Sequence, residues 1–181
     1  MTRKRGAAVG LALALALAVA AGPGCGYALV GKGVTTDVSI KRIGVPMFRD
    51  YTGKPGLDQK ITEKVIEELL KRGRFDVVQQ TADVDATVDG ELTAFLVTPV
   101  GFSDAATQTQ ANRYSVVLIA RVKYAKVGER ESIWESDAFQ YRDEYDVSDE
   151  PGAFVQLEGQ AIDRLSTQFA RSLVSAMLEA F

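Results

Sequence analysis

Residues 43–78 read IGVPMFRDYTGKPGLDQKITEKVIEELLKRGRFDVV, and this stretch decides the fold. Apolar residues recur every four positions in its middle, which predicts an amphipathic helix over residues 57–72. Gly73 should close that helix, because glycine readily takes the left-handed conformation found after a helix C-terminus. The apolar stripe of the helix consists of Leu57, Ile61, Val65 and Leu69.

An apolar segment of strand length lies on each side of this helix, at 38–48 and 75–79. Pro46 restricts the first segment to an edge or to the end of a strand, because proline cannot donate a ladder hydrogen bond. A strand, a helix and a second strand in this order predict a crossover between two parallel strands.

The second half of the chain predicts three more strands and a second helix. Alternating apolar and polar residues indicate strands over 86–97, 114–126 and 132–141, and the last two should form a hairpin. Residues 98–113 (TPVGFSDAATQTQANR) predict a polar loop between the first two of these strands. Capping and acidic residues at 148–151 then mark a helix start. The stripe of that second helix consists of Ile162, Leu165, Phe169, Leu173 and Met177.

The expected fold is therefore α+β, with the elements in the order β-α-β-β-β-β-α. Two amphipathic helices and a sheet with one apolar face can bury each other in two layers. We expect a two-layer sandwich in which two helices cover a mixed, mostly antiparallel sheet of four to five strands.

The first 24 residues have the composition of a secretory signal peptide. Three basic residues come first and a run of about 15 apolar residues follows, which is short for a spanning helix of about 20 residues. Gly22, Pro23 and Gly24 then disfavour any continuation of a helix. We therefore expect residues 1–24 to be cleaved.

Cys25 is the only cysteine and stands directly after this segment. The arrangement resembles a bacterial lipoprotein signal, in which the cysteine is acylated and becomes the mature N-terminus, although Gly22 stands where that signal prefers leucine. The alternative is an ordinary secreted protein with a free thiol. Gly26 stands where an aspartate would favour inner-membrane retention, so the resemblance implies the outer membrane. We expect a lipidated tether over 25–37 and a single α+β domain over 38–181.

Composition argues against several classes of function. The chain has no histidine, which removes histidine-based triads and most zinc ligand sets. Its net charge is −3, whereas a nucleic-acid binder usually presents a basic face. Nucleophile-elbow and phosphate-loop motifs are also missing from the sequence. We expect no catalytic residue, no metal, no cofactor and no bound nucleic acid.

Two groups of charged residues remain as candidate sites. Four acids lie at odd-numbered positions, where they should share the solvated face of a strand rather than hold a metal. Arg121 and Lys123 also share one strand face, from which they could meet phosphate groups; the alternative is an ordinary solvated face. The four acids are Asp83, Asp85, Asp89 and Glu91.

Four stretches resemble the LptE family, the lipopolysaccharide-assembly lipoproteins of the bacterial outer membrane. They are CGYALVGKG, IGVPMFRDYTGKPGLDQKITEKVIEELLKRGRFDVV, ADVDATVDGEL and RYSVVLIARVKYAKVGERESIW. The resemblance covers nearly all of residues 25–181. The second stretch is also similar to other periplasmic assembly lipoproteins, including those of curli secretion and activators of penicillin-binding proteins.

This resemblance implies a non-enzymatic, periplasm-facing protein anchored in the outer membrane through a lipid, such as palmitate, on Cys25. It would plug the LptD β-barrel, help to assemble it, and assist the passage of lipopolysaccharide to the cell surface. Candidate lipopolysaccharide contacts are Arg121 and Lys123. Candidate barrel contacts are the 98–113 loop and the turn after the first strand, with Arg49, Tyr51 and Lys54. The alternatives are a lipoprotein that activates a cell-wall synthase or serves another secretion pore, and a lipid-anchored enzyme.

Overall fold

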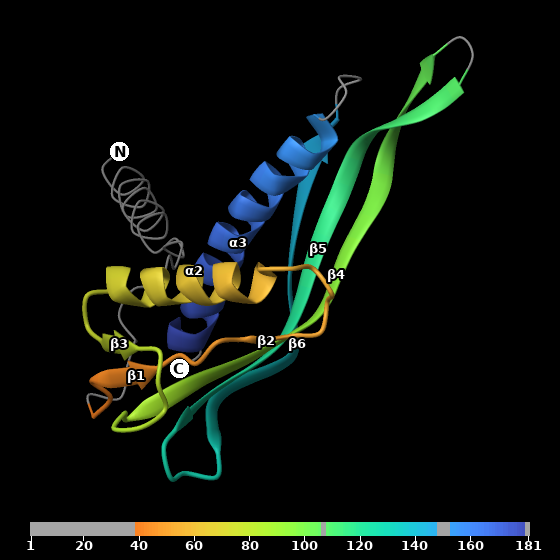
Figure 1. The fold of residues 1–181 in the computed structure, drawn as a ribbon. Helices are drawn as coiled ribbons and strands as arrows, with labels where there is room; N and C mark the ends of the chain where they lie inside the picture. The colour runs from red at the N-terminus through yellow and green to blue at the C-terminus, as the bar shows by residue number, and fades with distance from the viewer. Residues whose placement is uncertain (1–38, 106–107, 148–152, 180–181) are drawn as a thin grey trace, which may run out of the picture. The chain divides into compact units, whose positions relative to one another are not determined.

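The computed structural model describes residues 39–105, 108–147 and 153–179. In chain order its elements are β1 (Arg42–Gly44), β2 (Arg49–Asp50), α2 (Leu57–Lys71), β3 (Asp76–Val78), β4 (Ala86–Ala105), β5 (Gln108–Lys126), β6 (Ser132–Asp146) and α3 (Ala153–Glu179) (Figure 1). The expected signal, the tether and the start signal of the second helix lie outside the described residues.

The α+β class and the order of the elements are confirmed. The sheet has six strands. Five of them follow the order β3-β1-β4-β5-β6, and the sixth, β2, pairs with β4 outside this order. The sixth strand is β2, whose two residues pair with Glu91 and Leu92; periodicity cannot reveal so short a strand. β1 pairs in parallel with both β3 and β4, as the crossover predicted. The two long pairs, β4–β5 and β5–β6, are antiparallel.

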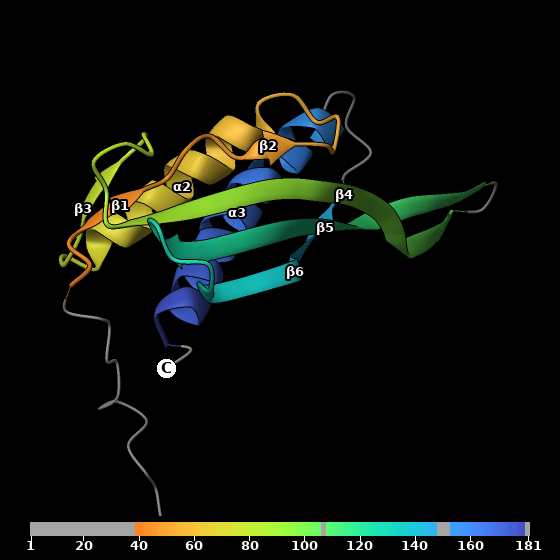
Figure 2. The same ribbon diagram turned by 90° about the horizontal axis from the view of Figure 1, so that it is seen from below.

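Both helices lie on the same side of the sheet, and the core fills the space between the two layers (Figures 1 and 2). The predicted stripes of α2 and α3 are buried, and from the sheet side they meet alternate residues of β4 and β5. Burying one such side chain fully contributes about 1.5–3 kcal/mol, so these two stripes supply much of the driving force for folding. The sheet residues of this core are Val88, Leu92, Val116, Leu118, Ala120 and Val122.

Thr62 joins α2 to the segment between β1 and β2. Its side chain is buried, and its hydroxyl donates to the Asp58 carbonyl at 2.7 Å. The same hydroxyl accepts the backbone N–H of Phe48 at 3.0 Å. A buried polar group is tolerated when its hydrogen bonds are made, and this one also fixes where Phe48 enters the core.

Gly90 of β4 provides the space for that phenyl ring. A Cβ atom at Gly90 would lie 2.3 Å from two ring carbons of Phe48, a distance that real side chains do not reach. Phe48 is 1% exposed. The segment before β2 therefore packs directly on the backbone of the sheet.

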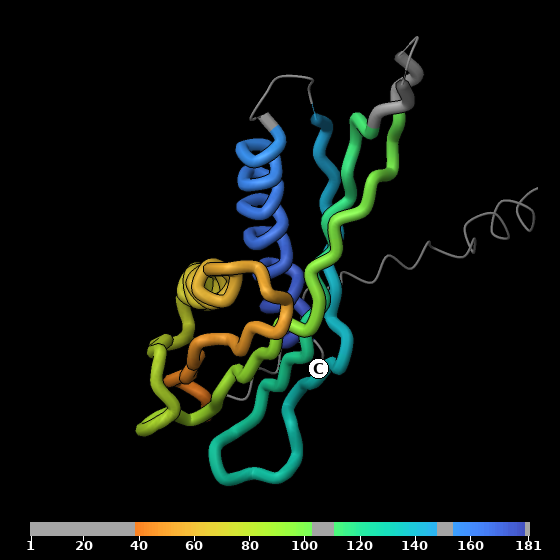
Figure 3. The backbone as a smooth tube through the Cα atoms, turned by 45° about the vertical axis from the view of Figure 1, so that its right-hand side comes forward, coloured from red at the N-terminus to blue at the C-terminus, as the bar shows by residue number. Residues whose placement is uncertain are grey.

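The predicted loop over residues 98–113 is wrong. The β4–β5 ladder continues through it, from Pro99 opposite Tyr114 to Ala105 opposite Gln108, with irregular register around Gly101. This part of the hairpin leaves the helical layer (Figures 1 and 3). A strand that packs no face against a helix needs no apolar alternation, so the sequence lacks the pattern by which strands are recognised.

Within the described part of the chain, neither helix is both long and apolar enough to cross a membrane.

Candidate interaction surfaces

Two of the candidate cations meet at one carboxylate on the outer face of the sheet. Glu91 binds Arg49 of β2 at 2.7 Å and Arg121 of β5 at 2.9 Å. Arg121 also contacts Asp137 of β6 at 3.3 Å, which extends the network across four strands. The pairing of β2 and β5 with opposite edges of β4 places both arginines beside Glu91. The sequence did not predict that Glu91 binds both arginines, because this contact depends on the order of the strands in the sheet.

Lys123 is exposed on the same strand as Arg121 and lies opposite Asp89 on β4 and Glu135 on β6. Carboxylates therefore stand beside both candidate lipopolysaccharide contacts. Lys123, Asp89 and Glu135 are all exposed, and an exposed ion pair contributes only about 0–1 kcal/mol, so a phosphate could exchange for a partner of Lys123 at low cost. Glu91, the partner of Arg121, is different, because its side chain is only 19% exposed.

The turn after β2 is built by local hydrogen bonds. Asp50 accepts both the N–H and the hydroxyl of Thr52, each at 2.7 Å. Lys54 contacts Glu158 of α3 at 3.0 Å and lies over the ring of Phe95 at 5.8 Å from its centroid. Lys54 thus connects the turn to α3 and β4 rather than pointing freely outward.

Tyr51 differs from Lys54 because its side chain is 63% exposed. Its backbone N–H donates to the Leu92 carbonyl of β4 at 2.9 Å. Among the described residues, no strand pairs with this edge of β4 after Leu92. Tyr51 therefore stands where the unpaired edge of β4 begins.

The upper part of β4 carries four exposed apolar side chains, which we call the outer strip: Leu96, Val97, Val100 and Phe102. Leu96 and Val97 are consecutive in the strand and point to opposite faces of the sheet, and Val97 lies opposite the buried Val116. Leu96 is 50% and Phe102 61% exposed. Residues 92–103 (LTAFLVTPVGFS) contain no charged residue. The sequence shows this uncharged run. Its exposure depends on the path of β4, which extends beyond the helical layer and therefore cannot be read from the sequence.

The acidic cluster does not form one site. Asp85 accepts the backbone N–H groups of Lys41 and Arg42, each at 2.8 Å, and thereby attaches the start of β1 to β4. These hydrogen bonds favour the ionised carboxylate and lower the pKa of Asp85. Across residues 39–105, 108–147 and 153–179, no group of three acids, histidines or cysteines is arranged to hold a metal ion.

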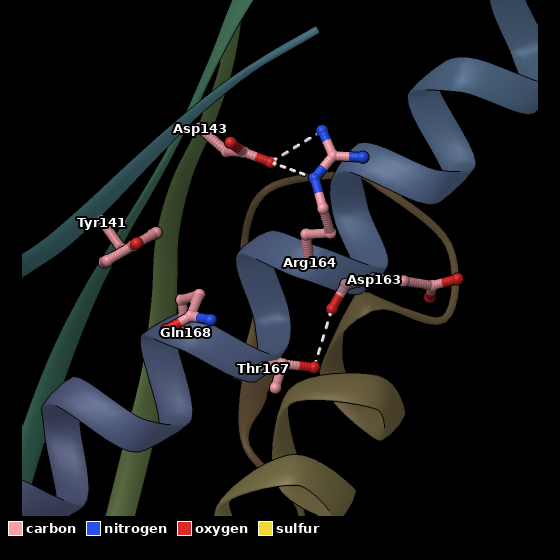
Figure 4. Close-up of a pocket in the computed structure, with 6 residues that line it drawn as sticks. All are labelled: Tyr141, Asp143, Asp163, Arg164, Thr167 and Gln168. Atoms are coloured by element: carbon pink, nitrogen blue, oxygen red, sulfur yellow. Dashed lines mark hydrogen bonds and ion pairs between the residues drawn. The ribbon is translucent and has the colours of Figure 1, made fainter.

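A polar groove of about 490 Å³ lies between β6 and α3 (Figure 4). Arg164 crosses it, with its guanidinium 3.0 Å from Asp143 and 3.3 Å from the Glu144 carbonyl oxygen. Asp163 pairs with Lys60 of α2. The lining residues are Tyr141, Asp143, Asp163, Arg164, Thr167 and Gln168. The groove carries charge, but its ions are paired within the chain.

Tyr145 is 5% exposed, and its hydroxyl has no hydrogen-bond partner among the described residues. Its ring stacks on Tyr114 with centroids 5.7 Å apart. Burial, reinforced by the nearby Glu158 carboxylate, raises the pKa of Tyr145 to about 12. The folded state therefore retains a phenol proton that the unfolded chain loses near pH 10.

Tyr145→Phe should not reduce stability at pH 7, because no hydrogen bond is lost. Between pH 9 and 11 the wild-type protein should lose about 1 kcal/mol relative to the variant, since only the unfolded tyrosine ionises there. Urea unfolding of the wild-type protein and the variant at pH 7, 9 and 11 measures this difference in the free energy of unfolding. A difference between the two proteins that stays constant with pH would contradict the assignment.

Comparison with known proteins gives one family. The model of the LptE family, described as lipopolysaccharide-assembly, matches residues 40–177. No curated protein sequence matches the chain.

Solved structures share the fold at low sequence identity. A protein from Xanthomonas campestris has a TM-score of 0.58 at 12% identity, covering 77% of this chain and 84% of its own. A hypothetical protein from Chlamydia trachomatis has a TM-score of 0.52 at 9% identity, covering 79% of this chain and 100% of its own. A weaker match, which does not bear on the fold, is the rare lipoprotein B from Shewanella oneidensis, with a TM-score of 0.43 at 11% identity, covering 77% of this chain and 92% of its own. The family match spans most of the sequence and nearly the whole described fold, and the chain belongs to the LptE family of lipopolysaccharide-assembly proteins.

Proposed function

We propose that this protein is a non-enzymatic lipoprotein of the outer membrane that plugs an LptD-type β-barrel. In that position it helps to assemble the barrel and assists the transport of lipopolysaccharide to the cell surface. Membership of the LptE family, a family of non-enzymatic lipoproteins, supports the general role. The observation that carries the proposal in this chain is the outer strip on a hairpin that leaves the helical layer.

The chemistry of the outer strip favours a protein partner over lipid. Several large apolar side chains exposed along one uncharged strand segment favour an interaction site. In the described residues the edge of β4 is unpaired beyond Leu92, so its peptide groups would lack hydrogen bonds in hydrocarbon. A protein surface can supply both apolar contacts and hydrogen bonds.

This partner should recognise side chains rather than add a long strand. The missing N–H of Pro99 and the irregular register around Gly101 interrupt the β4 edge. An added strand would therefore find a regular ladder only over residues 94–98. Side chains of the outer strip remain accessible along its whole length.

We extend the proposed barrel contact to the end of β2. Tyr51 stands where the unpaired edge of β4 begins, at Leu92, and Arg49 precedes it on β2 in the Glu91 network. Lys54, which binds Glu158, contributes by holding the turn in place. Arg121 and Lys123 are the proposed lipopolysaccharide contacts, where phosphates would replace the neighbouring carboxylates.

Cys25→Ala tests the proposed anchor. We expect the variant to incorporate no fatty acid and to retain its signal peptide, because the lipid-dependent cleavage needs the cysteine. Radiolabelled palmitate and the intact mass of the purified chain measure both effects, with the wild-type protein as control. Incorporation of label at the wild-type level would show that Cys25 is not the lipid acceptor.

A further inference from the structure

The described fold begins at Ser39, just before a short strand with few backbone partners. β1 pairs with β4 at only two positions, Ile43 and Gly44. Among the described strands, β3 pairs only with β1 (Figure 1). A force that pulls on the chain before Ser39 therefore reaches β1 first, where only a short ladder joins it to the long strands of the sheet.

The side chain of Asp85 extends this pairing beyond the backbone ladder. Its Oδ2 atom accepts the N–H groups of both Lys41 and Arg42, each at 2.8 Å. Two successive N–H groups directed at one anion form a favourable anion site in the backbone. The N–H of Asp85 also donates to the Arg42 carbonyl at 2.9 Å. Asp85 therefore holds the start of β1 through both its side chain and its backbone.

Two further hydrogen bonds connect this contact to neighbouring segments. The N–H of Asp76, the first residue of β3, donates to the Lys41 carbonyl at 2.8 Å. The N–H of Val127, in the turn between β5 and β6, donates to the Asp85 carbonyl at 3.0 Å. If Asp85 released β1, the Lys41 carbonyl would move and the hydrogen bond to β3 would be lost with it.

Burial decides how far such an opening can proceed. Opening of the chain as far as Arg42 exposes one core side chain, Ile40, which is 5% exposed in the closed state. Opening beyond Arg42 also exposes Ile43 and Val45, which are fully buried. The ends of strands open locally at a lower free energy than the whole domain. The first step is therefore the one that Asp85 can control.

We propose that Asp85 is a latch, which prevents a force on the N-terminal segment from separating β1 from the sheet. The force would come through the lipid on Cys25, so this role rests on the proposed anchor. Asp85 passes the force to β4, in which Ala86 is the next residue, and through its carbonyl to the β5–β6 turn. Without the latch, residues 39–42 would join the tether.

Residue-resolved amide hydrogen exchange on the purified, unlipidated full chain tests the latch. Asp85→Ala should raise the exchange rates of the Lys41 and Arg42 amides at least about tenfold, because the segment opens more often. The Asp76 amide should exchange faster by a similar factor, because its acceptor is the Lys41 carbonyl. Asp89→Ala removes another exposed carboxylate of β4 and is the matched control, which should leave all three rates unchanged.

Native-state exchange of the wild-type chain at low urea gives a test that does not require the variant to fold. The amides of Lys41, Arg42 and Asp76 should open together, with one free energy, before the central amides of β4 open. Separate openings of these three amides would overturn the proposal. So would a variant in which only Lys41 and Arg42 exchange faster, because Asp85 would then be a local acceptor and not a latch.

A force measurement tests the same role directly. One handle is attached to the Cys25 thiol of the unlipidated full chain, and the other to a cysteine introduced by Glu131→Cys just before β6. With Asp85→Ala the first lengthening step should occur at a lower force than with Asp85 in place. Equal forces would overturn the latch. A failure of the proposed anchor is distinguishable, because it would appear in the palmitate labelling of Cys25 and in neither of these measurements.

Discussion

Gly90→Ala should lower the free energy of unfolding by about 1–3 kcal/mol, the range typical of overpacked cores. The new methyl group would lie 2.3 Å from the ring of Phe48, which is 1% exposed and cannot swing into solvent. The whole stability of a domain is about 5–15 kcal/mol, so the loss is a large share of it. Urea unfolding followed by the fluorescence of Trp134, the only tryptophan, measures the change.

Gly159→Ala is the matched control. It is the same substitution in the interior of α3, where a Cβ atom meets nothing within 4 Å. It should raise stability by about 0.5–1 kcal/mol, because glycine is a poor helix former. Phe48→Leu should partly rescue Gly90→Ala, so the double variant should be more stable than the sum of the two changes indicates. Strict additivity would show that the ring and the glycine do not contact each other.

Replacing three of the four outer-strip side chains should sharply reduce capture of the barrel without unfolding the protein. The change is Leu96→Thr with Val100→Thr and Phe102→Thr, which places a β-branched residue, favourable in strands, at each position. Since these side chains are exposed, stability should change by about 1 kcal/mol or less. The yield of co-purified barrel should fall at least about tenfold, because exposed apolar anchors commonly dominate an interface.

The control for this variant is Val127→Thr with Val155→Thr. These valines are also exposed, at 56% and 72%, but lie in the β5–β6 turn and near the start of α3. The control should capture the barrel as well as the wild-type protein. Equal loss in both variants would show a general effect of surface polarity, and no loss in either would remove the outer strip from the interface.

Sequence periodicity predicted the elements that pack against each other. In α2 the four stripe residues are all buried, and Gly73 follows the helix with a φ of 67°. The parallel pairing of β1 with β3 followed from the order strand, helix, strand. In each case the burial of one face imposes a period on the sequence, and that period can be read without knowing the partner.

Features without a buried face, or with contacts between distant segments, could not be predicted. Beyond Tyr114, which still contacts Phe154 of α3, the hairpin extends away from the helices (Figure 1), so its polar residues resembled a loop. Glu91 gathers Arg49 and Arg121 only because β2 and β5 pair with opposite edges of β4. The contact of Gly90 with Phe48 likewise depends on the path of the chain before β2.

The central claim is that this chain occupies an LptD-type barrel. Affinity purification of a C-terminally tagged chain from detergent-solubilised outer membranes, followed by mass spectrometry of the captured proteins, tests it most directly. We predict one large β-barrel protein in equimolar amount that withstands stringent washing, and its loss with the outer-strip variant. Capture of a cell-wall synthase or of another secretion pore, with no such barrel, would contradict the proposed function.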